Sequence, residues 1–238
     1  MGGELQTLSA AETAGLLGWW LDMGVDTPVQ DEPRDWLKPA PPRAERAASP
    51  APQANVAEPS QETLAELRSW LASSAQLPLA TATAKRILPH GPEDAPVMLL
   101  SDAPALEDFV AGQPIGGEAW ALTVRMLAAI GIAADAAYVA PLSCFHVPGA
   151  RLNAEDLDAC AALARRHIAL AKPKRLLLLG EGPARALTGK PFASARGHVQ
   201  RIEGVRTVAT FAPRHLLRRP SDKALAWQDL LLLMEDEV

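Results

Sequence analysis

Short apolar runs alternate with amphipathic stretches through residues 97–236 of this chain. The predicted strands cover 97–101, 137–141, 175–179, 198–203 and 205–210, and the predicted helices cover 117–130, 153–171, 181–188 and 221–236. The Leu-rich run at 175–179 is unbroken, which is typical of a strand buried on both faces of a sheet. This alternation predicts an α/β fold with three layers, α/β/α, around a mostly parallel central sheet.

Polar residues mark where several of these elements begin or turn. Asn153, with Asp156 at the third helical position, is predicted to cap the helix that follows. Glu203-Gly204 is a candidate tight turn between two strands. Residues 60–63 are predicted to open an earlier helix, whose apolar positions are Leu64, Leu67, Trp70 and Leu71.

The chain divides into three segments by composition. Residues 1–25 are predicted to form an amphipathic helix, residues 26–59 a Pro/Ala-rich linker, and residues 60–238 the folded domain. The apolar face of the first helix carries Leu16, Leu17, Trp20 and Met23. Because such a short helix is unstable alone, we expect it to dock, either on its own domain or on a protein partner.

The net charge of −5 is unevenly distributed. Residues 161–223 carry fourteen Lys or Arg and three Asp or Glu, a net charge of +11. Such a segment favours contact with a phosphate backbone. The alternative is a solvated surface whose charge is balanced by acidic residues elsewhere.

Three function classes are not indicated by the sequence. No apolar run approaches the length of a membrane span, and no secretory leader is visible. Two cysteines in 238 residues do not suggest a disulfide scaffold. We therefore expect a cytoplasmic protein without a membrane partner.

Six short motifs occur in a characteristic order. They lie at residues 97–105, 107–119, 138–144, 172–180, 196–197 and 211–220. Together they resemble the motifs of the iron–sulfur (family 4) uracil-DNA glycosylases, over roughly residues 62–238. The resemblance implies a divergent member of the uracil-DNA glycosylase superfamily, with its site at the carboxyl ends of the strands.

The resemblance implies that this chain differs from the family at four site positions. The catalytic position keeps a carboxylate, whereas the three recognition positions carry apolar residues. Asp102 stands where the family usually has a catalytic Glu, although an Asp before a turn is also a favoured helix cap. Ile115 replaces the aromatic residue that stacks on uracil. Ala140 replaces the Asn that reads the uracil edge, and Ala212 replaces the His that stabilises the departing base.

The base pocket implied by the resemblance comprises Ala103, Pro104, Ile115, Ala140, Ala212 and His215. His215 or His146 could substitute for the missing His. The alternative for either residue is a structural role or a phosphate contact.

The cluster ligands of family 4 are incomplete in this sequence. Cys144 and Cys160 stand where the family has two of its four ligands to a [4Fe–4S] cluster, but Ser74 and Leu77 occupy the other two positions. Since such clusters normally take four thiolates, we expect no cofactor and no metal site. Cys144 and Cys160 are then remnants of a cluster site.

The resemblance implies that DNA binds at the segment that follows strand 205–210. Arg214, Arg218, Arg219 and Lys223 are the predicted DNA-binding residues. This segment is predicted to be a loop followed by the start of a helix. Because cations are disfavoured at a helix start, Arg219 and Lys223 suggest an anionic partner.

Three functions remain open from the sequence. The first is a DNA-binding protein related to base-excision repair, whose hydrolysis of the N-glycosidic bond is weak, lost or redirected to another lesion. The second is an active DNA glycosylase, a hydrolase that uses Asp102. The third is a non-catalytic interaction scaffold.

Overall fold

The computed structural model describes residues 63–81, 84–146 and 153–235. The predicted helix within residues 1–25 and the predicted linker at 26–59 lie outside the described residues. None of the helices in the described part of the chain combines the length and apolar character needed to cross a membrane.

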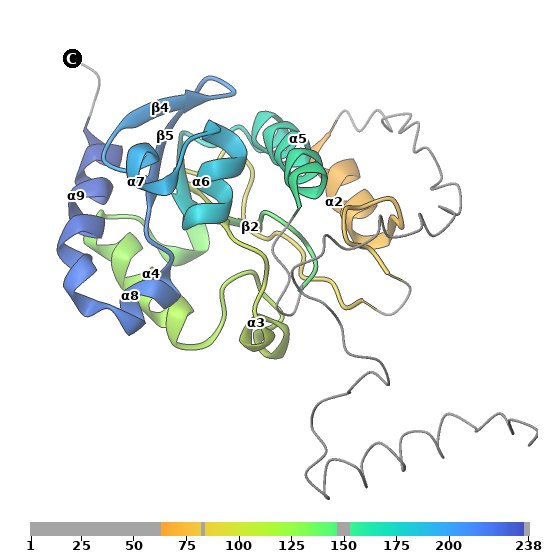
Figure 1. The fold of residues 1–238 in the computed structure, drawn as a ribbon, viewed down its shortest axis with the longest axis horizontal. Helices are drawn as coiled ribbons and strands as arrows, with labels where there is room; N and C mark the ends of the chain where they lie inside the picture. The colour runs from red at the N-terminus through yellow and green to blue at the C-terminus, as the bar shows by residue number, and fades with distance from the viewer. Residues whose placement is uncertain (1–62, 82–83, 147–152, 236–238) are drawn as a thin grey trace, which may run out of the picture. The chain divides into compact units, whose positions relative to one another are not determined.

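Five strands form one sheet in the order β2-β1-β3-β5-β4. They are β1 Met98–Ser101, β2 Tyr138–Pro141, β3 Arg175–Leu179, β4 Val199–Ile202 and β5 Val205–Thr210. Figure 1 shows β4 and β5, at one end of this order, beside each other. All neighbouring pairs are parallel except β4 and β5, which are antiparallel. The predicted mostly parallel sheet is confirmed.

Helices cover both faces of the sheet. The helices are α2 Leu64–Ser73, α3 Leu106–Ala111, α4 Gly117–Ala129, α5 Ala154–Ala171, α6 Glu181–Thr188, α7 Phe192–Ala195, α8 Pro213–Arg218 and α9 Lys223–Met234. Leu100 and Leu178 pack in a core with α2, α5 and α6, whereas Leu99 and Leu177 pack in a second core with α4 and α9. Successive strand residues therefore face opposite helix layers, as the three-layer prediction requires.

Local polar contacts confirm the predicted helix starts and turn. The side chain of Asn153 accepts a hydrogen bond of 2.7 Å from the N–H of Asp156 at the start of α5. Glu203 and Gly204 form the turn between β4 and β5 with φ values of 48° and 78°. Helix α2 begins after Thr63, which forms a capping box with Glu66.

Three short helices were not predicted from the sequence, namely α3, α7 and α8. Helix α8 lies where a loop was expected. Pro213 occupies its first turn, where the fixed φ of proline suits a helix and the missing N–H costs nothing. The helix predicted from residue 221 begins instead with a 3₁₀ turn at Pro220–Asp222, and α9 follows.

Two arginines connect the sheet to the end of α9. Arg175 and Arg206 lie opposite each other in the register of β3 and β5. Arg175 donates a hydrogen bond to the carbonyl of Leu233, and Arg206 donates one to the carbonyl of Leu232. Their positive charges thus meet the negative end of the α9 dipole.

A buried polar contact joins α2, β2 and α5. The hydroxyl of Tyr138 lies 2.7 Å from Nε2 of His167, and Nε of Arg68 donates to the same hydroxyl at 3.2 Å. Burial, together with the charge of Arg68, lowers the pKa of His167 to about 3. His167 is therefore neutral near pH 7, and it shares a hydrogen bond with the hydroxyl of Tyr138.

Candidate functional site

The carboxyl ends of β1, β3 and β5 lie side by side in the sheet. The chain leaves β1 toward β2 on one side and leaves β3 toward β5 on the other. The boundary between β1 and β3 is therefore the topological switch point, where open α/β sheets bind their ligands. Asp102 and Gly180 are the residues that follow these two strands.

The carboxylate of Asp102 lies against the glycine-containing start of α6. A Cβ on Gly182 would overlap with this carboxylate. A Cβ on Gly180 would lie 3.3 Å from Oδ2 of Asp102 and 3.3 Å from the Cβ of Ala212. Only glycines allow the carboxylate to approach the helix this closely. The structure thus brings Asp102 and Ala212, two of the predicted site residues, to the same place.

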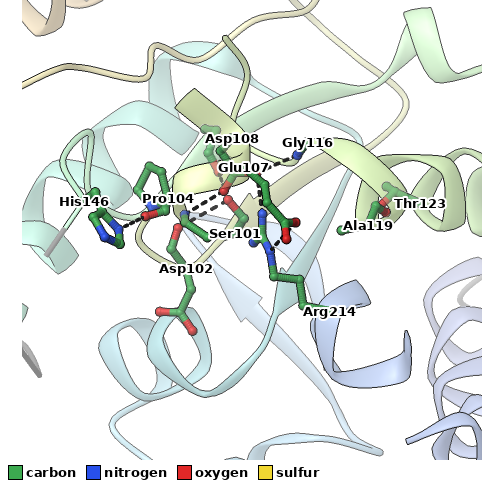
Figure 2. A network of polar contacts seen from close by, with 12 residues as sticks. Ser101, Asp102, Pro104, Glu107, Asp108, Gly116, Ala119, Thr123, His146 and Arg214 are labelled. Carbon is green, nitrogen blue, oxygen red and sulfur yellow. Dashed lines mark hydrogen bonds and ion pairs between the residues drawn. The ribbon is translucent and has the colours of Figure 1, made fainter. Parts of the chain in front are cut away.

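Two backbone groups hold the carboxylate of Asp102 in place. Part of Asp102 is exposed, yet the surrounding protein removes enough water to raise the pKa of its carboxyl group. Hydrogen bonds from the N–H groups of Gly182 and Ala103 act in the opposite direction, as the helix start also does. The arrangement places a carboxylate at the switch point, on a residue that remains partly exposed. Figure 2 shows this carboxylate pointing away from the Asp108–Arg214 contact.

Asp102 does not cap the helix that follows it, so that alternative is wrong. The N-cap of α3 is Ala105, whose N–H donates a hydrogen bond of 2.8 Å to Oδ2 of Asp108. Asp102 instead accepts from the start of α6, which is 80 residues away in sequence. Sequence spacing gave no signal for this contact.

The other predicted pocket residues differ in how deeply they are buried and in the core in which they pack. Ala103 and Ala212 are half-buried, and Pro104 is buried. Ile115 packs in the core with α4 and α9, and Ala140 packs in the core on the opposite face. None of these side chains carries a hydrogen-bonding group. The polar groups beside Asp102 are the N–H groups of Gly182 and Ala103 and the carboxylate of Glu181, whose charge also raises the pKa of Asp102.

The two histidines near the site are engaged in contacts. Nε2 of His215 lies 2.5 Å from Oδ2 of Asp222, and this hydrogen bond lowers the pKa of Asp222. The His215 ring stacks on Phe211 with centroids 4.9 Å apart. Nδ1 of His146 donates a hydrogen bond of 2.6 Å to the carbonyl of Pro104, in the turn that carries Asp102 (Figure 2).

A buried carboxylate ties the Asp102 turn to α8. Asp108 is fully buried and accepts hydrogen bonds from the N–H groups of Ala105 and Gly116. It also accepts from Nη2 of Arg214, whose Nε lies 3.9 Å from Glu107 (Figure 2). Arg214 was predicted to bind DNA, but here its guanidinium is used to hold α3, the start of α4 and α8 together.

Other cations of the basic segment are also used within the fold. Of its fourteen Lys and Arg residues, six donate to carbonyl groups or carboxylates: Arg165, Arg175, Arg196, Arg201, Arg206 and Arg214. The sequence count of +11 therefore overstates the charge available to a partner.

The predicted DNA-binding residues other than Arg214 are exposed. Arg218, Arg219 and Lys223 lie in and around the turn between α8 and α9. Arg218 and Arg219 end α8, where positive charge is favoured. Arg219 both ends α8 and precedes the 3₁₀ turn at Pro220–Asp222, so the argument from a helix start applies fully only to Lys223, the first residue of α9.

The residues at the expected cluster position do not fit an iron–sulfur cluster. Cys144 and Cys160 pack in one core with Leu77. Burial raises the pKa of Cys144 to about 11 and that of Cys160 to about 12, so both remain thiols at neutral pH. The hydroxyl of Ser74 accepts from the N–H of Gln76. The cavity beside Cys144 has a volume of about 10 Å³, close to the least that one water needs.

No metal-binding group of three or more His, Cys, Asp or Glu side chains is present among residues 63–81, 84–146 and 153–235.

Comparison with known proteins identifies the family. A sequence model of the uracil DNA glycosylase superfamily matches residues 88–231, more than half of the chain and all five strands. The type-4 uracil-DNA glycosylase of Pyrobaculum aerophilum is 26% identical over 147 residues, which cover 57% of this chain and 75% of that protein. The type-4 uracil-DNA glycosylase of Archaeoglobus fulgidus is 24% identical over 141 residues, or 55% and 71% of the two chains. The chain therefore belongs to the uracil-DNA glycosylase superfamily.

Proposed function

We propose that this protein is a DNA-binding relative of the base-excision repair glycosylases in which hydrolysis of the N-glycosidic bond of uracil is weak, lost or redirected to another base. The observation that carries the proposal is the site itself. A fixed carboxylate, Asp102, stands at the switch point, while the side chains expected to recognise uracil are those of Ile115, Ala140 and Ala212.

The chemistry of base excision explains why this combination matters. A glycosylase extrudes the nucleotide and holds the base by stacking and by hydrogen bonds to its edge. Bond cleavage then needs a carboxylate near the sugar and a donor near the base oxygen. Asp102 supplies the carboxylate, which can stabilise a sugar cation or orient water. The three apolar residues supply neither an aromatic face nor a side-chain donor.

Uracil excision is expected to be slow. Loss of a single positioned oxyanion donor typically lowers the rate about 100- to 1,000-fold, and here the stacking and edge-reading groups are also changed. The measurement is base release from single- and double-stranded oligonucleotides that carry uracil or one of a panel of damaged bases. Any excision should fall in Asp102→Asn and in Gly182→Ala, because a Cβ at Gly182 displaces the carboxylate.

The matched control is Glu203→Gln, which removes an exposed carboxylate in the turn between β4 and β5, at the opposite end of β5 from Ala212, and keeps Asp102. It should excise at the rate of the unmodified protein. Rapid release of uracil that Asp102→Asn abolishes would contradict the proposal and would establish an ordinary uracil-DNA glycosylase instead.

DNA binding is expected to depend on the turn between α8 and α9. Arg218→Ala combined with Arg219→Ala should weaken binding to all sequences and flatten the plot of log affinity against log salt. Each lost phosphate contact should reduce the slope by roughly 0.7 to 0.9. Fluorescence anisotropy across a salt series measures both quantities.

The control pair is Lys174→Ala with Lys190→Ala, which removes the same charge from two exposed positions. Lys174 precedes β3 and Lys190 follows α6, so neither lies at the carboxyl ends of the strands. Equal salt slopes in the two double variants would show that net charge, rather than the turn between α8 and α9, binds DNA.

A further inference from the structure

Helix α9 exposes large apolar side chains in addition to those that it buries in the domain. Ala226, Leu230 and Leu233 are buried against the rest of the domain. Trp227 and Leu231 belong to the same helix, yet they are 41% and 45% exposed. Large apolar side chains that are exposed together on one helix often mark a binding surface, so Trp227 and Leu231 point to one on α9.

This side of α9 borders a groove. Leu122, Met126 and Ala129 line it from α4, at the spacing of one helix stripe. Trp227 and Leu230 line it from α9. The groove has a volume of about 170 Å³ and is open to solvent. Two neighbouring helices with such a stripe between them can accept the apolar face of a third helix.

The charges beside the groove indicate what kind of helix fits. Arg125 and Lys223 are exposed and line the groove, and among the described residues no Asp or Glu does. A second copy of this groove would bring like charges together, which is unfavourable. A helix with Asp and Glu beside its apolar stripe would meet the two cations at its edges.

We propose that the groove between α4 and α9 binds an acidic amphipathic helix of a protein partner. Trp227 is the central aromatic anchor, and Arg125 and Lys223 select for acidic flanks. The surface lies on α4, α8 and α9, whereas Asp102 lies at the start of α6, so the inference does not depend on the proposed chemistry at Asp102. Lys223 is also one of the predicted DNA-binding residues, so the groove adjoins the turn proposed to bind DNA, and competition with DNA distinguishes the two roles.

The test uses the full chain and a designed fluorescent peptide as the probe. The peptide is a helix of about 15 residues with Leu or Trp at positions i, i+3, i+4 and i+7 and Glu on its other positions. A second peptide has Lys in place of every Glu. Anisotropy titrations should show that the acidic peptide binds about tenfold or more tightly than the basic one, and that Trp227→Ala removes most of this affinity.

Charge reversal makes the test specific. Arg125→Glu with Lys223→Glu should invert the preference, so that the basic peptide binds more tightly. Leu225→Ala is the matched control, because Leu225 is exposed on α9 but does not line the groove. Circular dichroism of each variant confirms that the fold is retained.

Three results would overturn the proposal. One is equal binding of the two peptides, or binding that Trp227→Ala leaves unchanged. Another is concentration-dependent self-association in sedimentation that Trp227→Ala abolishes, because this would assign the groove to a second copy. The third is displacement of the acidic peptide by single-stranded DNA with equal loss of DNA binding in Trp227→Ala, because this would assign the groove to nucleic acid.

Discussion

Replacing Asp108 by Ala is expected to lower the free energy of unfolding by about 3–5 kcal/mol, the usual cost of removing one partner from a buried ion pair. Asp108 is fully buried and accepts from two backbone N–H groups as well as from Arg214. The variant leaves all three donors without their acceptor. The segments that lose their connection are α3, the start of α4 and α8.

Glu107→Ala is the matched control for this experiment. Glu107 is the adjacent residue and lies 3.9 Å from the same guanidinium, but its side chain is 70% exposed. Exposed ion pairs contribute about 0–1 kcal/mol, so the variant should unfold close to the unmodified protein. Urea denaturation measures both. Equal losses in the two variants would show that burial of Asp108 does not stabilise this corner of the domain.

The second large effect concerns acid. The folded protein holds His167 neutral, since burial lowers its pKa to about 3 from the ordinary 6.5. Between these two values the unfolded chain binds a proton that the folded chain does not. Stability is therefore fully present above pH 6.5 and is lost as the pH falls toward 3, by up to about 1.4 kcal/mol per pH unit from this one group.

His167→Gln should remove this contribution, because an amide oxygen can still accept from Tyr138 and does not titrate. The measurement is the difference in unfolding free energy between the two proteins from pH 7 to pH 4. His90→Gln is the control. Partial burial also lowers the pKa of His90, but this residue is far more exposed than His167, so a smaller effect on the unfolding free energy is expected. Parallel pH profiles for His167→Gln and the unmodified protein would contradict the assignment.

The architecture was predictable where elements are long enough to show a period. Helix α5 and the Leu-rich β3 differ from the sequence prediction by at most one residue at either end. Helices α3, α7 and α8 have four to six residues, which is too few to display an apolar stripe. The family resemblance also implied a loop at Pro213, although a proline at a first helical turn favours a helix.

The site was predictable in its location and less so in its contacts. The carboxyl ends of parallel strands lie at one edge of a sheet. The sequence alone therefore predicts that Asp102 and Ala212 lie at the same edge. The partners of Arg214 and Asp102 lie 106 and 80 residues away in sequence. No local pattern reports such a pairing. Arg214 therefore could not be distinguished from the exposed Arg218 by sequence alone.

The position of α9 also constrains when the domain can fold during synthesis. The chain emerges from the ribosome in order, so β3 and β5 are available before residues 223–234. Until α9 arrives, Arg175 and Arg206 lack the carbonyl groups that accept their hydrogen bonds in the finished domain, and the apolar surface that Leu230 and Leu233 cover remains open. The helix layer formed by α4 and α9 is therefore completed late, and part of the apolar face of the sheet stays uncovered until then.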